Sequence, residues 1–187
     1  MRINVLVLAI CLLAAFFAGE HFAQNAKSAW EKTATKSDNY EKVPDFEFVD
    51  LNSNTYNITE FRSNYIILNF WASWCIPCKV EFPILLDIAA EHSENLTLIL
   101  LSSDREKDDI IRFLESIEKQ GSDLSELENV IIAHDQNKKI THDLFNTIKL
   151  PETILVDPTG DMIKKVVGVR WAKEDITGLI EPKDLSQ

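Results

Sequence analysis

Two apolar runs of strand length lie in the middle of the chain. They cover residues 65–70 (YIILNF) and 96–101 (LTLILL). A strand that is almost entirely apolar is typical of one buried on both faces of a sheet, as happens when helices cover both sides. These two runs are therefore expected to form the centre of the sheet.

Shorter segments predict the rest of the sheet. Residues 46–49 alternate between apolar and polar, and a turn at 52–54 joins them to 55–58, so a small hairpin is expected. Residues 130–133 and 153–156 are further short strands. The Asp-Pro-Thr-Gly turn at 157–160 then leads to 162–167, which predicts a closing antiparallel pair.

Between these strands, apolar residues follow helical spacing. One helix is predicted from Cys78 to about residue 94, and a second after a capping box formed by Ser103 and Glu106. Shorter helices are expected near 140–145 and 176–180. Alternating strands and helices predict an α/β fold, and the closing hairpin makes its sheet mixed.

The N-terminal residues differ from this pattern. Arg2 is followed by a nearly uninterrupted apolar run to residue 18, which is typical of a secretory signal. The run is close to the roughly 20 residues of a membrane-spanning helix, so an uncleaved anchor stays an alternative. We predict a signal peptide or membrane anchor at 1–23, a polar linker at 24–42 and one exported domain at 43–187, in the periplasm or on the outer face of the cytoplasmic membrane.

The composition excludes some classes of function. The 187 residues carry 19 Lys and Arg against 30 Asp and Glu, a net charge of −11. This balance argues against nucleic acid as a partner, because such a protein needs a basic face. Three cysteines are too few for a disulfide-stapled scaffold, and Cys11 lies inside the apolar leader.

The other two cysteines form the motif that carries chemistry, NFWASWCIPCKVEFP at residues 69–83. A strand leads directly into Cys75, and a helix starts there. Unpaired N–H groups and the helix dipole at that point favour a thiolate. Cys78 follows one turn later, Pro77 suits the first turn, and Trp74 is expected to cover one side of the sulfur. We predict a redox pair in which Cys75 is exposed and attacks first.

Two other interpretations of the pair have less support. A zinc site needs two further ligands, and His92, His134 and His142 show no metal-type pairing. A structural disulfide closing so short a loop removes little entropy from the unfolded chain. The sequence therefore predicts neither a metal nor a cofactor.

A second feature lies before the strand at 153–156. Leu150 and Pro151 immediately precede it. An X-Pro bond in a folded protein is cis in only ~5–6% of cases. At this position, however, a cis bond would let the Leu150 backbone pair with an extended client segment.

The WASWCIPC motif and the proline-preceded strand resemble the thioredoxin fold. Three further features, the leader, the Cys-x-x-Cys-x-x-Glu-x-Pro pattern and the predicted N-terminal hairpin, resemble the TlpA/ResA/CcmG group of thiol–disulfide oxidoreductases. The PETILVDPTG segment resembles one in the cytochrome c maturation branch of that group. The resemblance covers roughly residues 43–170. It implies a thioredoxin-like fold with an N-terminal hairpin and a central insertion, placed here at 104–130. It also implies a Cys75–Cys78 redox disulfide and substrate contacts by Trp74, Pro77, Leu150 and Pro151.

The resemblance leaves Glu81 with two interpretations. In this group a glutamate at that position tunes the cysteine pair; the alternative is a surface residue paired with Lys79. Asn69 stands where thioredoxin itself has a buried aspartate. The structure must therefore decide whether Glu81 lies near the cysteines.

The function expected is reduction of client protein disulfides. The Ile76-Pro77 dipeptide lacks the histidine that makes a strong oxidant, so a low potential is expected. Such a reductant needs a membrane electron donor. Apocytochrome c is the first candidate client and copper-site assembly proteins the second.

Two different functions remain as alternatives. A thiol peroxidase on this fold needs Pro and Thr where Leu68 and Ala72 stand. A copper-binding assembly factor uses Cys-x-x-x-Cys with a distant histidine. The pair here is one residue closer, and His134 is only a distant candidate.

Overall fold

The computed structural model describes residues 41–119, 121 and 124–180. The predicted leader at 1–23, and the predicted linker at 24–42 except for its last two residues, lie outside this part of the chain. None of the helices in the described part is long and apolar enough to cross a membrane.

A five-stranded mixed sheet forms the centre of the domain, as the sequence predicts. The strands lie in the order β5-β4-β3-β6-β7. The pairs β3–β4 and β4–β5 are parallel, whereas β6 is antiparallel to both β3 and β7. Their bounds are β3 Tyr65–Trp71, β4 Leu96–Ser102, β5 Val130–His134, β6 Glu152–Val156 and β7 Met162–Val167.

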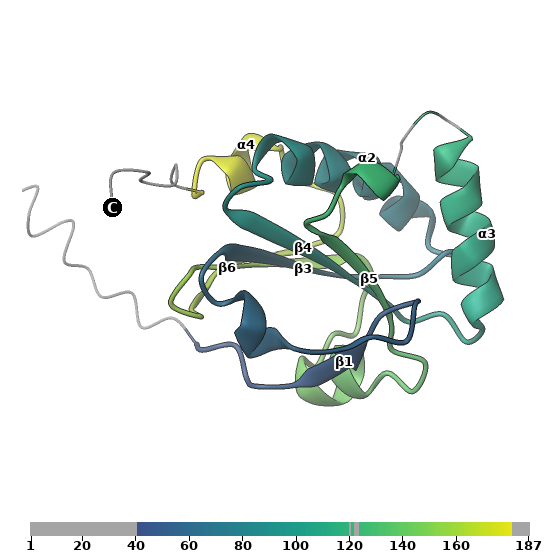
Figure 1. The fold of residues 1–187 in the computed structure, drawn as a ribbon, viewed down its shortest axis with the longest axis horizontal. Helices are drawn as coiled ribbons and strands as arrows, with labels where there is room; N and C mark the ends of the chain where they lie inside the picture. The colour runs from purple at the N-terminus through teal and green to yellow at the C-terminus, as the bar shows by residue number, and fades with distance from the viewer. Residues whose placement is uncertain (1–40, 120, 122–123, 181–187) are drawn as a thin grey trace, which may run out of the picture. The chain divides into compact units, whose positions relative to one another are not determined.

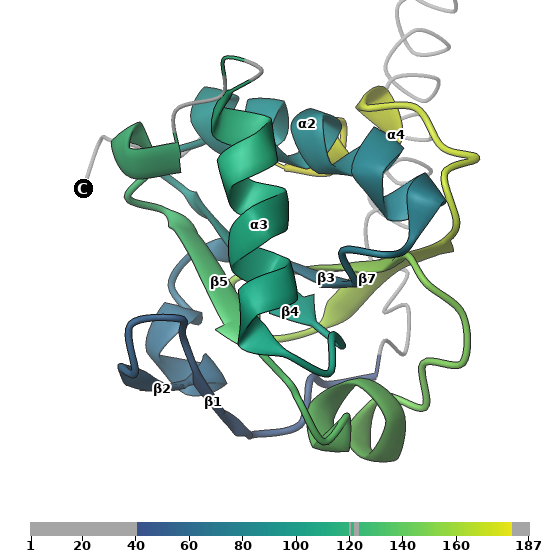
Figure 2. The ribbon, with the colours of Figure 1, turned by 90° about the vertical axis from the view of Figure 1, so that its right-hand side faces the viewer.

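Different elements cover the two faces of this sheet (Figures 1 and 2). One face packs against three α-helices: α2 (Ile76–Glu91), α3 (Lys107–Glu118) and the short α4 (Glu174–Thr177). The opposite face packs against residues 43–61 and the region around Phe145. This second layer contains the expected hairpin, β1 (Glu47–Val49) with β2 (Thr55–Asn57), then η1 (Ile58–Phe61) and η3 (Lys139–Leu144).

Alternation along β3 divides its side chains between the two layers. Ile66, Leu68 and Phe70 pack into the hairpin side, whereas Ile67 and Trp71 pack beneath the helices. This is the period of two that a strand imposes. Asn69 follows the same period and therefore lies on the side of α2.

The stretch at 104–130 contains the crossover that parallel strands require. Helix α3 connects β4 to β5 and buries Ile110, Phe113 and Ile117. The predicted capping box is wrong, since Glu106 is the N-cap of α3 and no side chain caps it. Ser103 instead continues from the end of β4, where its hydroxyl lies 3.2 Å from that of Thr141.

The helix predicted near residue 140 exists, but it is a π-helix. The Asp135 carboxylate accepts hydrogen bonds from the N–H groups of Ile140 and Thr141 at its start. The Phe145 N–H then bonds to the Ile140 carbonyl five residues earlier. A short 3₁₀ turn, η2 (Leu124–Glu126), precedes β5.

Candidate active site

The cysteine motif lies where β3 passes into α2. Cys75 is the N-cap of this helix, and its Sγ accepts a hydrogen bond of 3.2 Å from the Cys78 N–H. A disulfide joins the two cysteines, with their Cα atoms 5.3 Å apart. No acidic residue occupies the first turn of α2. The sulfur of Cys75 therefore lies at the positive end of a helix with no carboxylate in that turn to oppose it.

The exposure of the pair differs from the sequence-based expectation. Cys75 is only 6% exposed and Cys78 only 2%, so the prediction of an exposed Cys75 is wrong for the disulfide-bonded form. The physical reason is that Cys75 Sγ is bonded to Cys78 under the first turn of the helix. Its neighbours Trp74 and Ile76 project outward instead, 62% and 74% exposed.

A cavity of about 650 Å³ adjoins the cysteine motif. Cys75 lines it and Cys78 does not. Trp74, Pro77 and Leu150, three of the predicted substrate-binding residues, also line it. The structure thus brings the motif and the segment before β6 to the same cavity.

Pro151, the fourth predicted substrate-binding residue, follows Leu150 in sequence and does not itself line the cavity. It is buried, the Leu150–Pro151 peptide is cis, and the Pro151 carbonyl accepts a hydrogen bond of 2.8 Å from the Gly168 N–H. The backbone N–H and carbonyl of Leu150 form no hydrogen bond with any residue in the described ranges. The cavity is therefore lined by a residue, Leu150, whose backbone N–H and carbonyl can still form hydrogen bonds.

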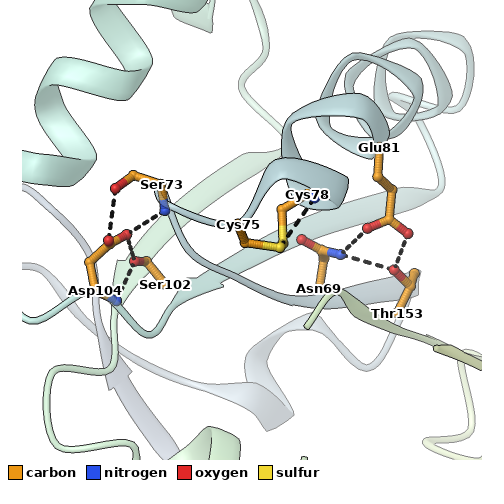
Figure 3. The surroundings of a disulfide bond; sticks show 8 residues. All are labelled: Asn69, Ser73, Cys75, Cys78, Glu81, Ser102, Asp104 and Thr153. Carbon is orange, nitrogen blue, oxygen red and sulfur yellow. Dashed lines mark hydrogen bonds between the residues drawn. A yellow bond between two sulfur atoms is a disulfide. The ribbon is translucent and has the colours of Figure 1, made fainter. Parts of the chain in front are cut away.

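Glu81 is buried, which excludes the surface interpretation. Its carboxylate accepts hydrogen bonds from Asn69 Nδ2 at 3.0 Å, Thr153 Oγ1 at 2.9 Å and Trp171 Nε1 at 2.8 Å (Figure 3 shows the first two). Glu81 follows Cys78 by three residues on α2, so both side chains lie on the same helix face. The strand register places Asn69 directly opposite Thr153, beneath that face.

Burial raises the pKa of the Glu81 carboxyl above its ordinary value. The hydrogen bonds from Thr153, Trp171 and Asn69 oppose this shift without cancelling it. A carboxyl that keeps its proton to higher pH, one helical turn from a cysteine, is suited to exchanging a proton with a thiol.

Asp104 is a site residue that sequence analysis missed. Its carboxylate is fully buried and accepts hydrogen bonds from the Ser73 N–H at 2.8 Å, the Ser73 hydroxyl at 2.8 Å and the Ser102 hydroxyl at 2.7 Å (Figure 3). Ser73 lies two residues before Cys75, so Asp104 ties the end of β4 to the turn that carries the nucleophile. The sequence signal that could have found it was an acidic residue two positions after the end of the apolar strand that became β4.

Removing this carboxylate should destabilise the fold. Asp104→Ala is expected to lower the free energy of unfolding by about 2–4 kcal/mol, because it leaves buried donors of Ser73 and Ser102 unpaired. Urea unfolding of the disulfide-bonded protein measures the change. The matched control is Asp87→Asn on the exposed face of α2, expected within about 0.5 kcal/mol of the original protein. Equal stability of the Asp104 variant and the control would contradict the role given to Asp104.

The histidine named for a copper site has another partner. His134 Nε2 lies 2.9 Å from the Asp104 carbonyl oxygen. Across residues 41–119, 121 and 124–180, no three His, Cys, Asp or Glu side chains are grouped so that they could hold a metal ion.

Comparisons with known proteins agree with this architecture. A family model described as Redoxin matches residues 39–179. The thiol-disulfide oxidoreductase ResA of Bacillus subtilis is 24% identical over 194 residues, which cover 100% of this chain and 95% of ResA. A solved structure described as a thiol:disulfide interchange protein DsbE, from Chlorobium tepidum, has a TM-score of 0.62 and 24% identity over 74% of this chain and 92% of its own. An exposed lipoprotein thioredoxin of Streptococcus pneumoniae has a TM-score of 0.56 and 22% identity over 72% of this chain and 96% of its own.

Together the fold, the cysteine pair at the start of α2 and these relatives define a thiol–disulfide oxidoreductase of the ResA/CcmG type with a thioredoxin-like fold. The chain belongs to the Redoxin family. The predicted fold class and the resemblance to the TlpA/ResA/CcmG group are both confirmed.

Proposed function

We propose that this protein is an exported reductase of client protein disulfides, with Cys75 as the attacking residue. The observation that carries the proposal is the position of the pair: Cys75 lines the cavity at the start of α2, and Cys78 lies behind it on the face that also carries Glu81. One cysteine can therefore meet a client while the other stays protected.

The reaction begins from the reduced pair. The Cys75 thiolate attacks one sulfur of the client disulfide, which breaks the client S–S bond and releases a client thiolate. Cys78 loses its proton, with Glu81 as the acceptor, and attacks Cys75 Sγ. The Cys75–Cys78 disulfide forms, the second client thiolate leaves, and two electrons have passed from the protein to the client.

Client contact is assigned to the cavity lining. Trp74 and Pro77 line the cavity together with Cys75. The free backbone groups of Leu150, next to the buried Pro151, can pair with an extended client segment. Backbone pairing suits an enzyme that must accept a disulfide within a peptide chain.

The surroundings of the pair favour a reducing potential. Strong oxidants stabilise their thiolate, and the Ile76-Pro77 dipeptide offers no charge for this. Lys79 is the nearest cation in sequence, but its ammonium lies 5.8 Å from the centre of the Phe113 ring. A Glu81 carboxylate would further disfavour a thiolate on the same helix face.

Export and tethering follow from the leader at 1–23 and the linker at 24–42, and 43–187 is assigned as the catalytic domain. The similarity to a pneumococcal protein described as an exposed lipoprotein supports this location. A reductant outside the cytoplasm becomes oxidised with each turnover, so a membrane electron donor must restore the pair. Apocytochrome c is the first proposed client, on the PETILVD segment at 151–157, and copper-site assembly proteins are the second.

The redox potential tests the direction of the reaction. Equilibration of the full chain in thiol–disulfide buffers should give a potential nearer thioredoxin at ~−270 mV than DsbA at ~−120 mV. The fraction reduced is measured by thiol alkylation and mass spectrometry. A potential as oxidising as that of DsbA would overturn the proposal of a reductase.

Removal of the protein from its host tests which of the two proposed client classes it reduces. Haem-stained c-type cytochromes should be lost and should return when the original chain is restored, but not when it carries Cys75→Ala. Normal cytochrome levels combined with a defect in copper-dependent oxidases would move the assignment to the second client class.

A further inference from the structure

The charge of the cavity beside Cys75 is opposite to that of the whole protein. The chain has a net charge of −11. Its cavity nevertheless has Lys138, Lys149 and His142 in its lining, and none of the described residues that line it is an Asp or Glu. The lysines come from the segment between β5 and β6, whereas the cysteine motif comes from the junction of β3 and α2.

These two lysines are available to a ligand. Both are exposed, and neither forms an ion pair with any residue in the described part of the chain. His142 differs, because its Nδ1 lies 3.1 Å from a carboxylate oxygen of Asp143. Among the basic side chains that line the cavity, only the two lysines therefore lack an ion-pair partner in the described part of the chain.

The backbone holds Lys138 in a fixed place. Its N–H donates to the Asp135 carbonyl at 2.8 Å, and its carbonyl accepts from the His142 N–H at 2.8 Å. Lys138 also has a positive φ of 54°, as the N-cap of the π-helix. The Lys138 ammonium therefore extends from an ordered turn.

Exposed apolar side chains line the same cavity. Trp74, Ile76 and Ile148 all line the cavity and are 62%, 74% and 86% exposed. Large apolar side chains that remain exposed around a cavity mark a contact surface for a partner. A cavity lined by both lysines and exposed apolar side chains suits a peptide that carries both acidic and apolar side chains.

We propose that this cavity selects client segments in which Asp or Glu residues flank the disulfide cysteine, next to apolar side chains. This inference rests on the proposed function, since it names the clients of the same cysteine pair. Charge complementarity determines orientation and register as well as encounter rate. An acidic segment is repelled by most of this protein's surface, so the lysines direct its cysteine to Cys75.

Matched peptides test the proposal. Three disulfide peptides share length and apolar residues but carry Glu, Gln or Lys beside the cysteine. The full-length reduced protein, in neutral detergent, should reduce them with kcat/KM in the order Glu, Gln, Lys, differing by about twofold to tenfold between steps. Raising the salt concentration should compress these differences, because screening weakens exposed charge pairs.

Substitution of the lysines tests whether they cause this preference. Lys138→Gln combined with Lys149→Gln should bring the ratio of kcat/KM for the Glu peptide to kcat/KM for the Gln peptide close to one. Lys139→Gln is the matched control, because Lys139 is the exposed neighbour of Lys138 but does not line the cavity. Equal rates for all three peptides, or a preference that survives the double substitution, would overturn this inference. Failure to reduce any peptide would instead overturn the proposed reductase function.

Discussion

Cys78→Ala should convert the protein into a covalent trap for its clients, whereas Cys75→Ala should form no client adduct. Cys75 is the cysteine that lines the cavity, so it forms the mixed disulfide. Cys78 lies behind it and supplies the sulfur that resolves this intermediate. Without Cys78 the intermediate persists, and without Cys75 turnover should fall by about a thousandfold or more.

The measurement is the mass of the protein–peptide adduct after mixing each variant with a disulfide peptide, resolved without reducing agent. All variants carry Cys11→Ala, so that the third cysteine cannot form adducts. A protein with all three cysteines replaced gives the background. Adducts on Cys78 of the Cys75 variant, with none on Cys75 of the Cys78 variant, would reverse the assigned roles.

Glu81→Gln should slow disulfide reduction at neutral pH by about a hundredfold, the lower end of the contribution of a proton-transfer group. It should also move the cysteine titration to lower pH, because a negative charge is removed from the helix face that carries Cys78. Thiol alkylation rates across pH measure the second effect. Glu115→Gln on the exposed side of α3 is the matched control and should change neither quantity. An unchanged thiol titration in the Glu81 variant would leave that residue with a purely structural role.

The same variant gives a pH-dependent stability difference. Burial raises the folded-state pKa of Glu81, so as pH rises the unfolded chain loses this proton first, near a pKa of ~4.3. The free energy of unfolding of the original protein, relative to Glu81→Gln, should therefore fall as pH rises from this value through the folded-state pKa, and then level off. Urea unfolding of the disulfide-bonded forms isolates Glu81, since disulfide cysteines do not titrate. A flat difference between about pH 4 and about pH 8 would contradict the raised pKa.

Local sequence signals were sufficient to predict most of the strands and helices and to identify the redox cysteine pair. Apolar runs predict buried strands wherever they occur, so β3 and β4 could be placed within a residue or two. Cys75 and Cys78 are three residues apart, and their geometry depends only on the helix that begins between them. The capping box failed because Ser103 is held by the buried end of β4, a tertiary restraint that overrides a local motif.

The polar contacts around the cysteines depended on tertiary structure. Glu81 bonds to Asn69, Thr153 and Trp171, which lie 12, 72 and 90 residues away. Their meeting requires a particular strand register and the docking of the chain after β7 against α2. Asp104 and Ser73 are likewise 31 residues apart and meet only because β3 and β4 end at the same edge of the sheet.

The sequence by itself determined that this protein has an α/β domain with a dithiol at a strand-to-helix junction, because periodicity, turn residues and the Cys-x-x-Cys spacing act over a few residues. Tertiary structure alone decided that Glu81 is buried on the helix face that carries Cys78, that Asp104 anchors the turn before Cys75, and that two lysines without ion-pair partners among the described residues line the cavity. Those features arise from side chains distant in sequence, and only strand pairing and helix packing determine which of them share an environment.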